Sequence, residues 1–399
     1  MRKVLLLVEN APIPGDPRVW NEAVTLRNAG YQVCIIAPLD AVQPLQGAYS
    51  CVEGLFIYRF KQFEAQNKRL AYLLEYCCAF WQIFWLSLKI WRRHGFDVIH
   101  VANPPDLFFL PGLFYRCFAK KFVFDQHDPA PELFKVIFQD RARVLYWLLC
   151  LLECCSYRWA HLVIVPNESF LSRAYKRGGC APEKVFVVRN GPNLVHSKPY
   201  EPASELCFPT RKSYVLAYVG VMGKQDGVEN ALYALHHLVS LYGRSDVSAV
   251  FIGRGSMLSE LQELAQRLKL AEYTYFPGWL EMQDVVRYLA IADVGLAPDP
   301  QNGLNEFCTM LKVMEYMAAG LPVVAFDLLE TRVSAEGAAL YAKPNEIADF
   351  ARQIALLLKS EELRRAMGAT GQKRIVEVLS WEHSCPNLLA AYETLFSSG

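Results

Sequence analysis

Residues 304–326 read LNEFCTMLKVMEYMAAGLPVVAF, and this stretch decides how the second half of the chain is expected to fold. Over 309–319 the apolar residues recur at helical spacing, and Gly320 is typical of a helix end. Pro322 then opens a short apolar run, which predicts a buried strand over 323–326. The stretch therefore predicts a helix that is followed directly by a buried strand.

Two charged residues lie within this predicted helix, Lys312 and Glu315. The run 309–311 falls at the helix start, where free backbone N–H groups and the helix dipole favour a phosphate. A carboxylate further along the helix, at Glu315, could then accept hydrogen bonds from a ribose diol. The alternative is that Lys312 and Glu315 form a solvated pair on a core helix, but the surrounding chain favours a ligand site.

Length and composition bound the class of protein. A chain of 399 residues suggests two or three domains, and a net charge of +1 implies no strong field for nucleic acid. Arg2 and Lys3 are followed by only five apolar residues before Glu9, which is too short for a signal peptide. We therefore expect a cytoplasmic protein that does not bind nucleic acid.

The twelve cysteines show no CxxC pair and no Cys/His metal spacing. The adjacent pairs at 77–78 and 154–155 fall in apolar stretches with helical character. We therefore expect reduced and mostly buried thiols, rather than disulfides or a metal site.

The start of the chain predicts a β-α-β unit. Residues 3–8 and 31–38 are apolar strands, with a helix expected between them from about 21 to 28. Such a unit implies a parallel sheet with helices on both faces, and ligands of these sheets bind at the carboxyl ends of the strands.

The loop that follows the first strand lies at such an end. Gly15 would let the backbone approach a ligand closely, and Arg18 at the helix start could meet an anion. Asp16 could equally be an ordinary helix N-cap.

A polar cluster follows a later strand. KFVF at 121–124 predicts the strand, and DQHD at 125–128 falls just past its carboxyl end. A lone histidine is usually structural, but His127 has acids beside it, and Asp128 is one of them. His127 could donate to a sugar hydroxyl or shuttle a proton.

The second half repeats the α/β rhythm after a polar, proline-containing linker at 196–212. The strand at 214–219 leads into the glycine-rich turn GVMGKQDG at 220–227, and the strand at 247–252 ends in GRGS. Such turns can expose backbone N–H groups to phosphate, although any tight strand-to-helix connection can need glycine. A ligand held between two such halves would lie in a cleft.

Two stretches are rich in aromatic and aliphatic residues, 70–93 and 144–159. The first is interrupted by Glu75, Gln82, Ser87 and Lys89 and falls short of the run that a bilayer span needs. Each stretch could be an interfacial helix with a basic end, or a helix that simply packs on the sheet.

The order of these signals resembles that of the family-4 retaining glycosyltransferases, in particular a bacterial polysaccharide-type subgroup. The resemblance runs from the first β-α-β loop through DVIH (97–100), QHD (126–128), RNGPN (189–193), FIGRG (251–255), FPGW (276–279), ADVGLAP (292–298), EYMAAGLPVV (315–324) and SWE (380–382).

The resemblance implies the α/β GT-B fold, in which two Rossmann-like domains face a cleft and a C-terminal helix crosses back to the first domain. Residues 1–198, with 380–399 packed on them, would bind the acceptor. Residues 210–379 would bind a nucleotide-sugar. No metal is expected, because helix N-termini and basic side chains would neutralise the leaving diphosphate.

By this resemblance Glu315 would hold the ribose, and the backbone near Trp279 would meet the base. His127 would lie near the transferred sugar, so His127 and Asp128 are the candidate catalytic residues. The candidate nucleotide-sugar contacts are Gly15, Gly223, Lys224, Arg254, Trp279, Thr309, Met310, Leu311, Lys312 and Glu315.

Three positions depart from the family pattern. Phe307 stands where the family usually has an acid, with Glu306 one place away, and Val221 and Asp226 replace an arginine and a lysine. The candidates to supply the missing positive charge are Lys224, Arg254, Lys312 and Arg332.

We therefore expect a retaining, metal-independent hexosyltransferase without a cofactor. Its donor would be a UDP-hexose or UDP-N-acetylhexosamine, and its acceptor a glycan or lipid-linked molecule in cell-surface polysaccharide synthesis. It could bind peripherally to the inner face of the cell membrane through 70–93 and 144–159. The alternatives are a nucleotide-sugar epimerase of the same fold and a nucleotide-sugar-binding subunit without catalysis.

Overall fold

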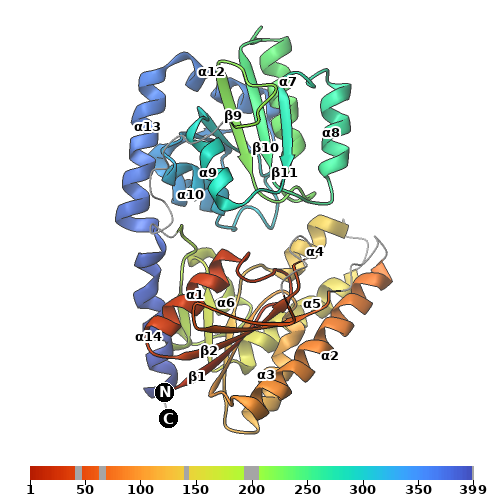
Figure 1. Cartoon of the computed structure of the whole chain (residues 1–399), viewed down its shortest axis with the longest axis vertical. Helices are drawn as coiled ribbons and strands as arrows, with labels where there is room; N and C mark the ends of the chain where they lie inside the picture. The colour runs from red at the N-terminus through yellow and green to blue at the C-terminus, as the bar shows by residue number, and fades with distance from the viewer. Residues whose placement is uncertain (41–46, 63–68, 139–142, 193–205, 398–399) are drawn as a thin grey trace. The chain divides into compact units, whose positions relative to one another are not determined.

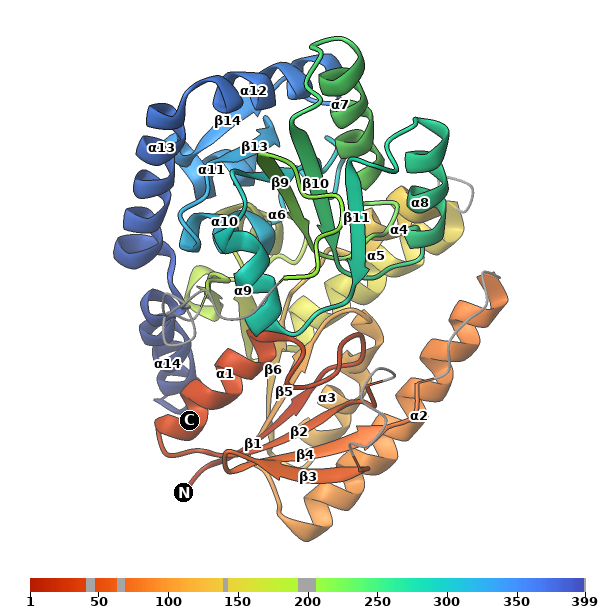
Figure 2. The ribbon, with the colours of Figure 1, turned by 45° about the horizontal axis from the view of Figure 1, so that its top comes forward.

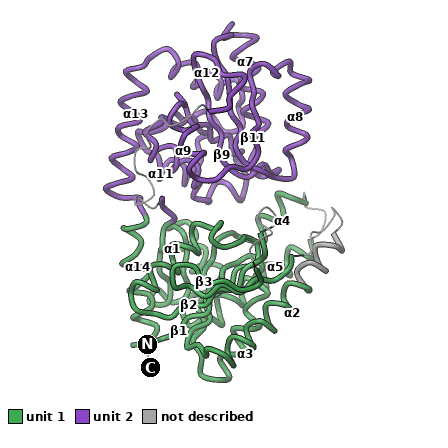
Figure 3. Tube along the Cα trace, in the orientation of Figure 1, with its two compact units in different colours: residues 1–189, 381–399 green, residues 190–380 purple. Residues whose placement is uncertain are grey.

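The computed structural model describes residues 1–40, 47–62, 69–138, 143–192 and 206–397. The chain divides into two compact units, one of Met1–Arg189 with Trp381–Gly399 and one of Asn190–Ser380 (Figure 3). Most of the predicted linker at 196–212 lies outside the described residues.

Unit 1 is built on an eight-stranded sheet of order β3-β4-β2-β1-β5-β6-β7-β8, in which only β3 is antiparallel to its neighbour. The strands are β1 (Lys3–Leu7), β2 (Gln32–Pro38), β3 (Tyr49–Val52), β4 (Leu55–Phe60), β5 (Val98–Ala102), β6 (Lys121–Asp125), β7 (Leu162–Val165) and β8 (Val185–Val187). The sequence analysis did not identify β3 and β4, which extend the sheet beyond β2 (Figure 2).

Helices cover both faces of this sheet. The helices of unit 1 are α1 (Pro17–Asn28), α2 (Arg69–Arg93), α3 (Phe109–Arg116), α4 (Ala130–Phe138), α5 (Arg143–Trp159), α6 (Glu168–Lys176) and α14 (Trp381–Ser397). One core cluster joins apolar side chains of α1 and α14 to β1 and β2, and these two helices lie side by side in Figure 1. The helix α2 packs against β2 and β4, and α3 packs against β5 and β6.

The first helix starts earlier than predicted, at Pro17 rather than Asn21. The carboxylate of Asp16 accepts the backbone N–H of Val19 at 3.0 Å and so caps the helix. Proline is favoured at the first helical position, because its fixed φ suits the turn and its missing N–H would have no partner there. The N-cap interpretation of Asp16 is therefore confirmed.

Unit 2 contains a six-stranded parallel sheet of order β11-β10-β9-β12-β13-β14. Numbered within the unit this order is 3-2-1-4-5-6, the order of Rossmann folds, which confirms the predicted α/β class. The strands are β9 (Tyr214–Val219), β10 (Val247–Ile252), β11 (Thr274–Gly278), β12 (Val294–Ala297), β13 (Val323–Phe326) and β14 (Ala339–Ala342).

Two apolar clusters lie on the faces of this second sheet. The helices are α7 (Val228–Ser240), α8 (Leu258–Arg267), α9 (Met282–Ala290), α10 (Leu311–Ala318), α11 (Leu329–Ala335), α12 (Ile347–Lys359) and α13 (Glu361–Arg374). The buried residues of α7, α8 and α12 form one cluster, whereas those of α9 and α10 belong to the other. The chain changes direction between β9 and β12, which is where ligands of such sheets bind.

Glycines allow the loops at this edge to approach one another. Gly253 follows β10 with φ +142°, and a Cβ there would lie 1.9 Å from the backbone oxygen of Gly220. Gly227 precedes α7 in a left-handed conformation, and a Cβ there would lie 2.6 Å from Pro300. Gly253 lets two loop backbones pack together, and Gly227 is favoured by its left-handed conformation and its close approach to the Pro300 side chain.

The end of the chain is not one continuous helical region. A π-helical turn, Ile375–Leu379, follows α13, and Ser380 is extended before α14 begins. The Trp381 indole N–H donates to the Thr25 hydroxyl at 2.9 Å, so α14 is fixed to unit 1. This confirms that the C-terminal helix returns to the first domain.

All twelve cysteines are free thiols, but the expectation that most are buried is wrong. Only Cys34 is buried, and Cys51, Cys77, Cys78 and Cys117 are among the exposed ones. The pair at 77–78 lies on α2, and both of its thiols are exposed. Apolar neighbours in the sequence therefore did not imply burial.

Both aromatic-rich stretches form helices, α2 and α5, close to the predicted limits. Within the part of the chain that the structure describes, no helix has both the length and the apolar character to cross a membrane.

Candidate functional site

The candidate donor site in unit 2 is centred on the start of α10. This helix begins at Leu311, two residues later than predicted, after Met310 in extended conformation as its N-cap. No side chain caps the first turn. Since α10 follows β12 in a parallel sheet, its N-terminus lies at the carboxyl edge of the sheet, and its N–H groups favour an anion there.

Glu315 lies on the partly exposed side of α10, between the buried residues Met314 and Tyr316. Its carboxylate has no hydrogen-bond partner among the described residues. Burial raises the pKa of Glu315, and the charge of Lys312 opposes this shift. The carboxylate is therefore partly exposed, and no described residue uses its acceptor capacity.

Lys312 is buried, in contrast, and its charge is already balanced. Its Nζ lies 2.5 Å from Asp299 Oδ1 and 3.9 Å from Asp226 Oδ1. Burial alone would lower the pKa of Lys312, but Asp299 and Asp226 outweigh it and raise the pKa. Lys312 reaches the candidate site as part of an internal ion-pair group, not as an exposed counter-charge.

The glycine-rich turn after β9 also satisfies its own groups. The backbone N–H of Gly223 donates to Asp226 Oδ2 at 3.0 Å, so this N–H is not directed at a ligand. The N–H of Met222 donates to the backbone oxygen of Arg254 at 2.9 Å, which joins the turn to the loop after β10. Lys224 is exposed on this turn.

Arg254 and Trp279 come together from the ends of β10 and β11. The Arg254 guanidinium lies 5.8 Å from the centroid of the Trp279 ring, and the indole is 40% exposed. An exposed aromatic ring beside a guanidinium suits stacking on a planar base. Arg332, by comparison, is bonded to Asp327 through two contacts of 2.7 and 2.6 Å.

Two residues near α10 have roles that the sequence analysis missed. Asn305 is buried, and its amide donates to the backbone oxygens of Gln225 (2.8 Å) and Pro300 (3.0 Å), which fixes the glycine-rich turn. Glu306 accepts the N–H of Leu329 at 3.3 Å at the start of α11. Glu306, which stands one place from the usual position of the family acid, is therefore hydrogen-bonded to the start of a neighbouring helix. Thr309 lies in the connection before α10.

In unit 1 the polar cluster after β6 is organised by a buried carboxylate, Asp125. Arg18 donates to it from Nη2 at 2.7 Å and from Nε at 3.2 Å, and His127 Nε2 lies 2.6 Å from its Oδ2. Burial would raise the pKa of Asp125, but Arg18 and His127 outweigh it and hold the pKa well below its usual range. The sequence analysis expected Arg18 to meet an anion, and in the structure this anion is the Asp125 carboxylate of the protein itself.

Glu22 and His100 complete this cluster from α1 and β5. Arg18 Nε lies 3.3 Å from Glu22 Oε1, and His100 Nδ1 is hydrogen-bonded to the Tyr392 hydroxyl of α14 at 2.8 Å. Burial lowers the pKa of His100 and raises that of Glu22 well above its usual range. The sequence analysis did not single out Glu22, because one acid in an amphipathic helix carries no signal.

His127 and Asp128 lie at the rim of this cluster. The side-chain oxygen of Asn103 accepts the N–H groups of His127 at 2.7 Å and Asp128 at 3.2 Å. The Asp128 carboxylate is partly exposed and has no hydrogen-bond partner within the described residues, and burial raises its pKa. Gly15 is exposed in the loop before α1.

One group in unit 1 has donor atoms close enough to share a metal ion. Among the described residues, Glu22, His100 and Asp125 place one ligand atom each within 4.8 Å of one another. The Arg18 guanidinium already pairs with both carboxylates, at 3.3 and 2.7 Å. Because Arg18 supplies the positive charge there, the arrangement fits an internal ion-pair cluster better than a cation site.

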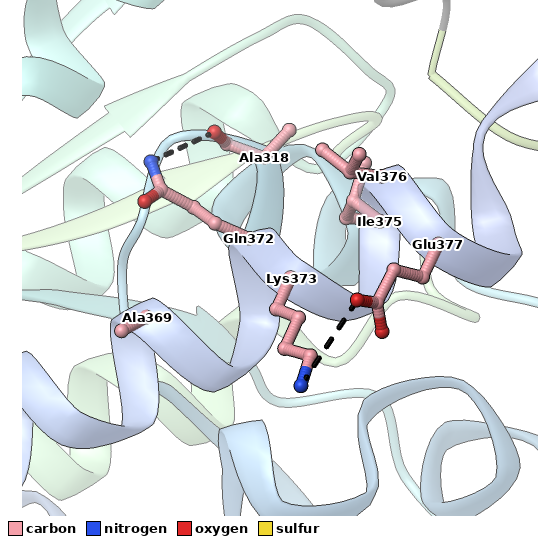
Figure 4. Close-up of a pocket in the computed structure, with 7 residues that line it drawn as sticks. All are labelled: Ala318, Ala369, Gln372, Lys373, Ile375, Val376 and Glu377. Carbon is pink, nitrogen blue, oxygen red and sulfur yellow. Dashed lines mark hydrogen bonds and ion pairs between the residues drawn. The ribbon is translucent and has the colours of Figure 1, made fainter.

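A shallow pocket on unit 2 lies away from these residues. Its lining comes from the C-terminal end of α10 and from α13 and the π-helical turn (Figure 4). Gln372 Nε2 donates to the Ala318 backbone oxygen at 3.5 Å across it. It contains none of the predicted site residues.

Comparisons with known proteins match both units. Residues 208–374 match the family described as Glycosyl transferases group 1, and residues 16–191 match the family described as Glycosyl transferase 4-like domain. Between them the two matches cover most of the chain.

The curated relatives are distant. The MMP alpha-(1->4)-mannosyltransferase of Mycolicibacterium hassiacum is 23% identical over 205 residues, which are 51% of this chain and 49% of the relative. Several other matched relatives are also named mannosyltransferases. The chain spans about half the length of the curated relatives it matches.

Solved structures match over the whole chain. Sucrose-phosphate synthase from Thermosynechococcus elongatus gives a TM-score of 0.81 at 17% identity, with all of both chains covered. HepE from Anabaena, solved in complex with UDP-glucose, gives a TM-score of 0.70 at 15% identity and covers 99% of this chain and 100% of its own. At these identities the likeness shows the GT-B fold alone.

Proposed function

Because the chain belongs to the group 1 glycosyltransferases, with an N-terminal domain of the glycosyltransferase 4-like type, we propose that it is a sugar transferase. It would transfer a hexose or N-acetylhexosamine from UDP to a glycan or lipid-linked acceptor. The anomeric configuration would be retained. Unit 2 would bind the donor, and unit 1 the acceptor. The proposed setting is cell-surface polysaccharide synthesis at the cytoplasmic face of the membrane.

The observation that carries this proposal is the Glu315 carboxylate. It is partly exposed and unpaired among the described residues, and it lies on α10 behind a first turn that no side chain caps. A helix N-terminus suits a diphosphate, and a carboxylate on the same helix suits a vicinal diol. A nucleoside diphosphate presents both groups at neighbouring positions.

In the proposed reaction, the bond between the anomeric carbon and the diphosphate oxygen breaks. The acceptor oxygen forms a bond to the same carbon on the same face, and its proton passes to the leaving phosphate oxygen. The protein would mainly position the partners and stabilise the charge on the diphosphate. The proposed contacts for this charge are the N–H groups at 309–311 together with Lys224 and Arg254, since Lys312 is already paired.

Titration calorimetry with UDP tests the donor site. Glu315→Ala should weaken UDP binding about 10- to 100-fold, because hydrogen bonds to a charged group contribute about 1.5–3 kcal/mol. Glu263→Gln is the control, because Glu263 is an exposed acid on α8 of the same unit. Unchanged UDP affinity in Glu315→Ala would remove Glu315 from the donor site.

A second candidate donor is GDP-mannose, because several matched relatives are mannosyltransferases and one is named as dependent on GDP-mannose. A thermal-shift panel of UDP- and GDP-sugars separates the two, since stabilisation rises with affinity. Product analysis by NMR with donor alone would reveal an epimerase. Binding without transfer to native acceptors would indicate a subunit that has lost catalysis.

A membrane surface is the proposed partner of unit 1. Trp81 and Trp85 on α2 are more than half exposed, and Phe114 on α3 and Phe118 in the turn after it are also exposed. Phe84 links the two groups, with ring centroids 6.3 Å from Trp81 and 5.3 Å from Phe114. We call these residues the aromatic surface.

Basic residues continue the aromatic surface along α2, where Lys89, Arg92 and Arg93 are exposed. Aromatic rings beside basic groups suit an anionic lipid interface. In flotation with phosphatidylglycerol vesicles, Trp81→Ser with Trp85→Ser should reduce binding, and the control Leu241→Ser in unit 2 should not. A wild-type protein that never floats would contradict this proposal.

A further inference from the structure

The contacts of His127 bear on which ring atom could meet a substrate. Its Nε2 lies 2.6 Å from Asp125 Oδ2, and Asp125 is fully buried. The carboxylate is held between the Arg18 guanidinium and the imidazole, an arrangement that favours its ionised form. An ionised carboxylate can only accept hydrogen bonds, so the proton in this contact must reside on Nε2.

The position of this proton also determines the hydrogen-bonding role of the other ring nitrogen of His127, Nδ1. In a neutral imidazole with its proton on Nε2, Nδ1 carries a lone pair and can only accept. No described residue is hydrogen-bonded to Nδ1, and the side chain is 11% exposed. The exposed edge of the ring is therefore an acceptor for a hydroxyl proton, not a donor to a hydroxyl oxygen.

The backbone and a second buried contact hold the ring in this orientation. Asn103 accepts the His127 N–H at 2.7 Å, which fixes the chain just after β6. Arg18 Nη1 also donates to the Val188 backbone oxygen at 2.8 Å, so the guanidinium that holds Asp125 is itself fixed. Neither Asp125 nor Arg18 reaches the surface.

We propose that Asp125 is a positioning residue that, held by Arg18, keeps the His127 proton on Nε2 and so presents Nδ1 as the hydrogen-bond acceptor for a sugar hydroxyl. The inference rests on the proposed function, because it gives His127 a sugar ligand. It also specifies the hydrogen bond, in which the sugar hydroxyl donates and Nδ1 of His127 accepts. It also adds two buried residues, Asp125 and Arg18, to those on which turnover depends.

An isosteric substitution separates this role from a merely structural one. In the wild type Arg18 and His127 face two carboxylate oxygens. In Asp125→Asn the amide has only one acceptor oxygen for them. Arg18 can only donate, whereas the His127 ring can change tautomer, so the amide oxygen should stay at the Oδ1 position, 2.7 Å from Arg18 Nη2, although the 3.2 Å contact from Arg18 Nε is then lost. The NH2 group should therefore face His127. A donor in that position would drive the ring proton to Nδ1, so the outward atom would change from acceptor to donor.

Nitrogen NMR of protein labelled with ¹⁵N-histidine reads the tautomer directly, and His127→Gln identifies the His127 signals. At pH 8 the wild type should carry the proton on Nε2, and Asp125→Asn should move it toward Nδ1. The same variant should lower kcat by about 100-fold, the lower end of what proton-handling groups contribute, with donor KM nearly unchanged.

Asp97→Asn is the matched control, because Asp97 lies at the opposite edge of the same sheet and accepts the Lys3 N–H at 2.9 Å. It should change neither the His127 signals nor kcat. Arg18→Lys keeps the charge of Asp125 but loses the bidentate guanidinium contact. It should keep the His127 proton on Nε2, and kcat should fall less than in Asp125→Asn.

A wild-type proton on Nδ1 overturns the proposal, even if Asp125→Asn does not fold. So does an Asp125→Asn enzyme with normal kcat. The failure of the proposed function would appear elsewhere, as an absence of nucleotide binding or transfer in the wild type, while the tautomer could still be as inferred.

Discussion

Two carboxylates, Asp125 in unit 1 and Glu315 in unit 2, stand in corresponding places and in opposite states. Asp125 ends β6 in unit 1, and Glu315 lies on α10, which follows β12 in unit 2. Asp125 is fully buried and held by Arg18 and His127, whereas Glu315 is partly exposed and has no hydrogen-bond partner among the described residues. A carboxylate whose acceptor sites are filled by protein can only orient its neighbours. One with open sites can bind a ligand.

The buried positive charges, in contrast, are in the same state in the two units. Arg18 and Lys312 are both buried and both engaged with acids of their own unit. In unit 1 this pairing supports the histidine at the rim. In unit 2 it leaves Lys312 paired within the protein, so the helix N-terminus and exposed cations would have to stabilise the proposed diphosphate.

The largest expected effect comes from Arg18→Met. The substitution leaves Asp125 buried without its ion-pair partner, and breaking a buried pair in this way costs about 3–5 kcal/mol. Urea unfolding followed by tryptophan fluorescence measures it, because seven of the eight tryptophans (Trp20, Trp81, Trp85, Trp91, Trp147, Trp159 and Trp381) belong to unit 1.

The control is Arg365→Met, which removes an exposed pair with Glu361 on α13. Exposed pairs contribute between about 0 and 1 kcal/mol. Equal losses in the two variants would mean that the buried cluster is not a distinct, tightly coupled group.

Glu22→Gln should change how the stability of unit 1 depends on pH. Burial raises the pKa of Glu22 well above its usual range, and the charge of Asp125 adds to this. A raised folded-state pKa gives stability that is present at acid pH, and this stability is lost as the pH rises toward the folded value. The wild type should therefore lose stability relative to Glu22→Gln as the pH rises from about 5 to 8.

The measurement is the difference in urea midpoint between the two proteins at each pH, which cancels the other titrating groups of the unit. A difference that stays constant over this range would show that Glu22 has the same pKa in the folded and the unfolded chain. It would also weaken the contrast with Glu315.

A smaller effect is expected from Asp226→Asn in unit 2. The amide oxygen can still accept the Gly223 N–H, so the turn should keep its shape. Removing one negative charge near the proposed diphosphate site should tighten UDP binding by about 1 kcal/mol at an intermediate dielectric. Calorimetry at low and high salt checks this, since screening should reduce the gain. Weaker binding would place the diphosphate away from this turn.

The smallest effect is expected on the stability of Glu315→Gln. Since the carboxylate makes no hydrogen bond within the described residues, its loss should change the free energy of unfolding by no more than about 0.5 kcal/mol. Thermal unfolding without nucleotide measures this. A large loss of stability would show that Glu315 supports the fold, and the distinction from Asp125 would then disappear.

Much of the fold followed from local patterns. Apolar runs that alternate with helical periodicity predicted the two α/β units, and the motifs predicted the GT-B arrangement. The strands β3 and β4 were missed, because a short antiparallel pair at a sheet edge has half-exposed residues and little apolar signal. The break between α13 and α14 was not predicted either; the π-helical turn and the extended Ser380 lie where the chain passes from unit 2 to unit 1.

For the candidate sites, the sequence by itself determined which chemical groups were present and that they follow strand ends, because these depend on residue type and local order. Only the tertiary structure decided which groups are already engaged. Arg18 meets Asp125 across 107 positions, and Lys312 meets Asp299 and Asp226. Pairing and burial arise between distant segments, and they determine whether a charge is available to a ligand.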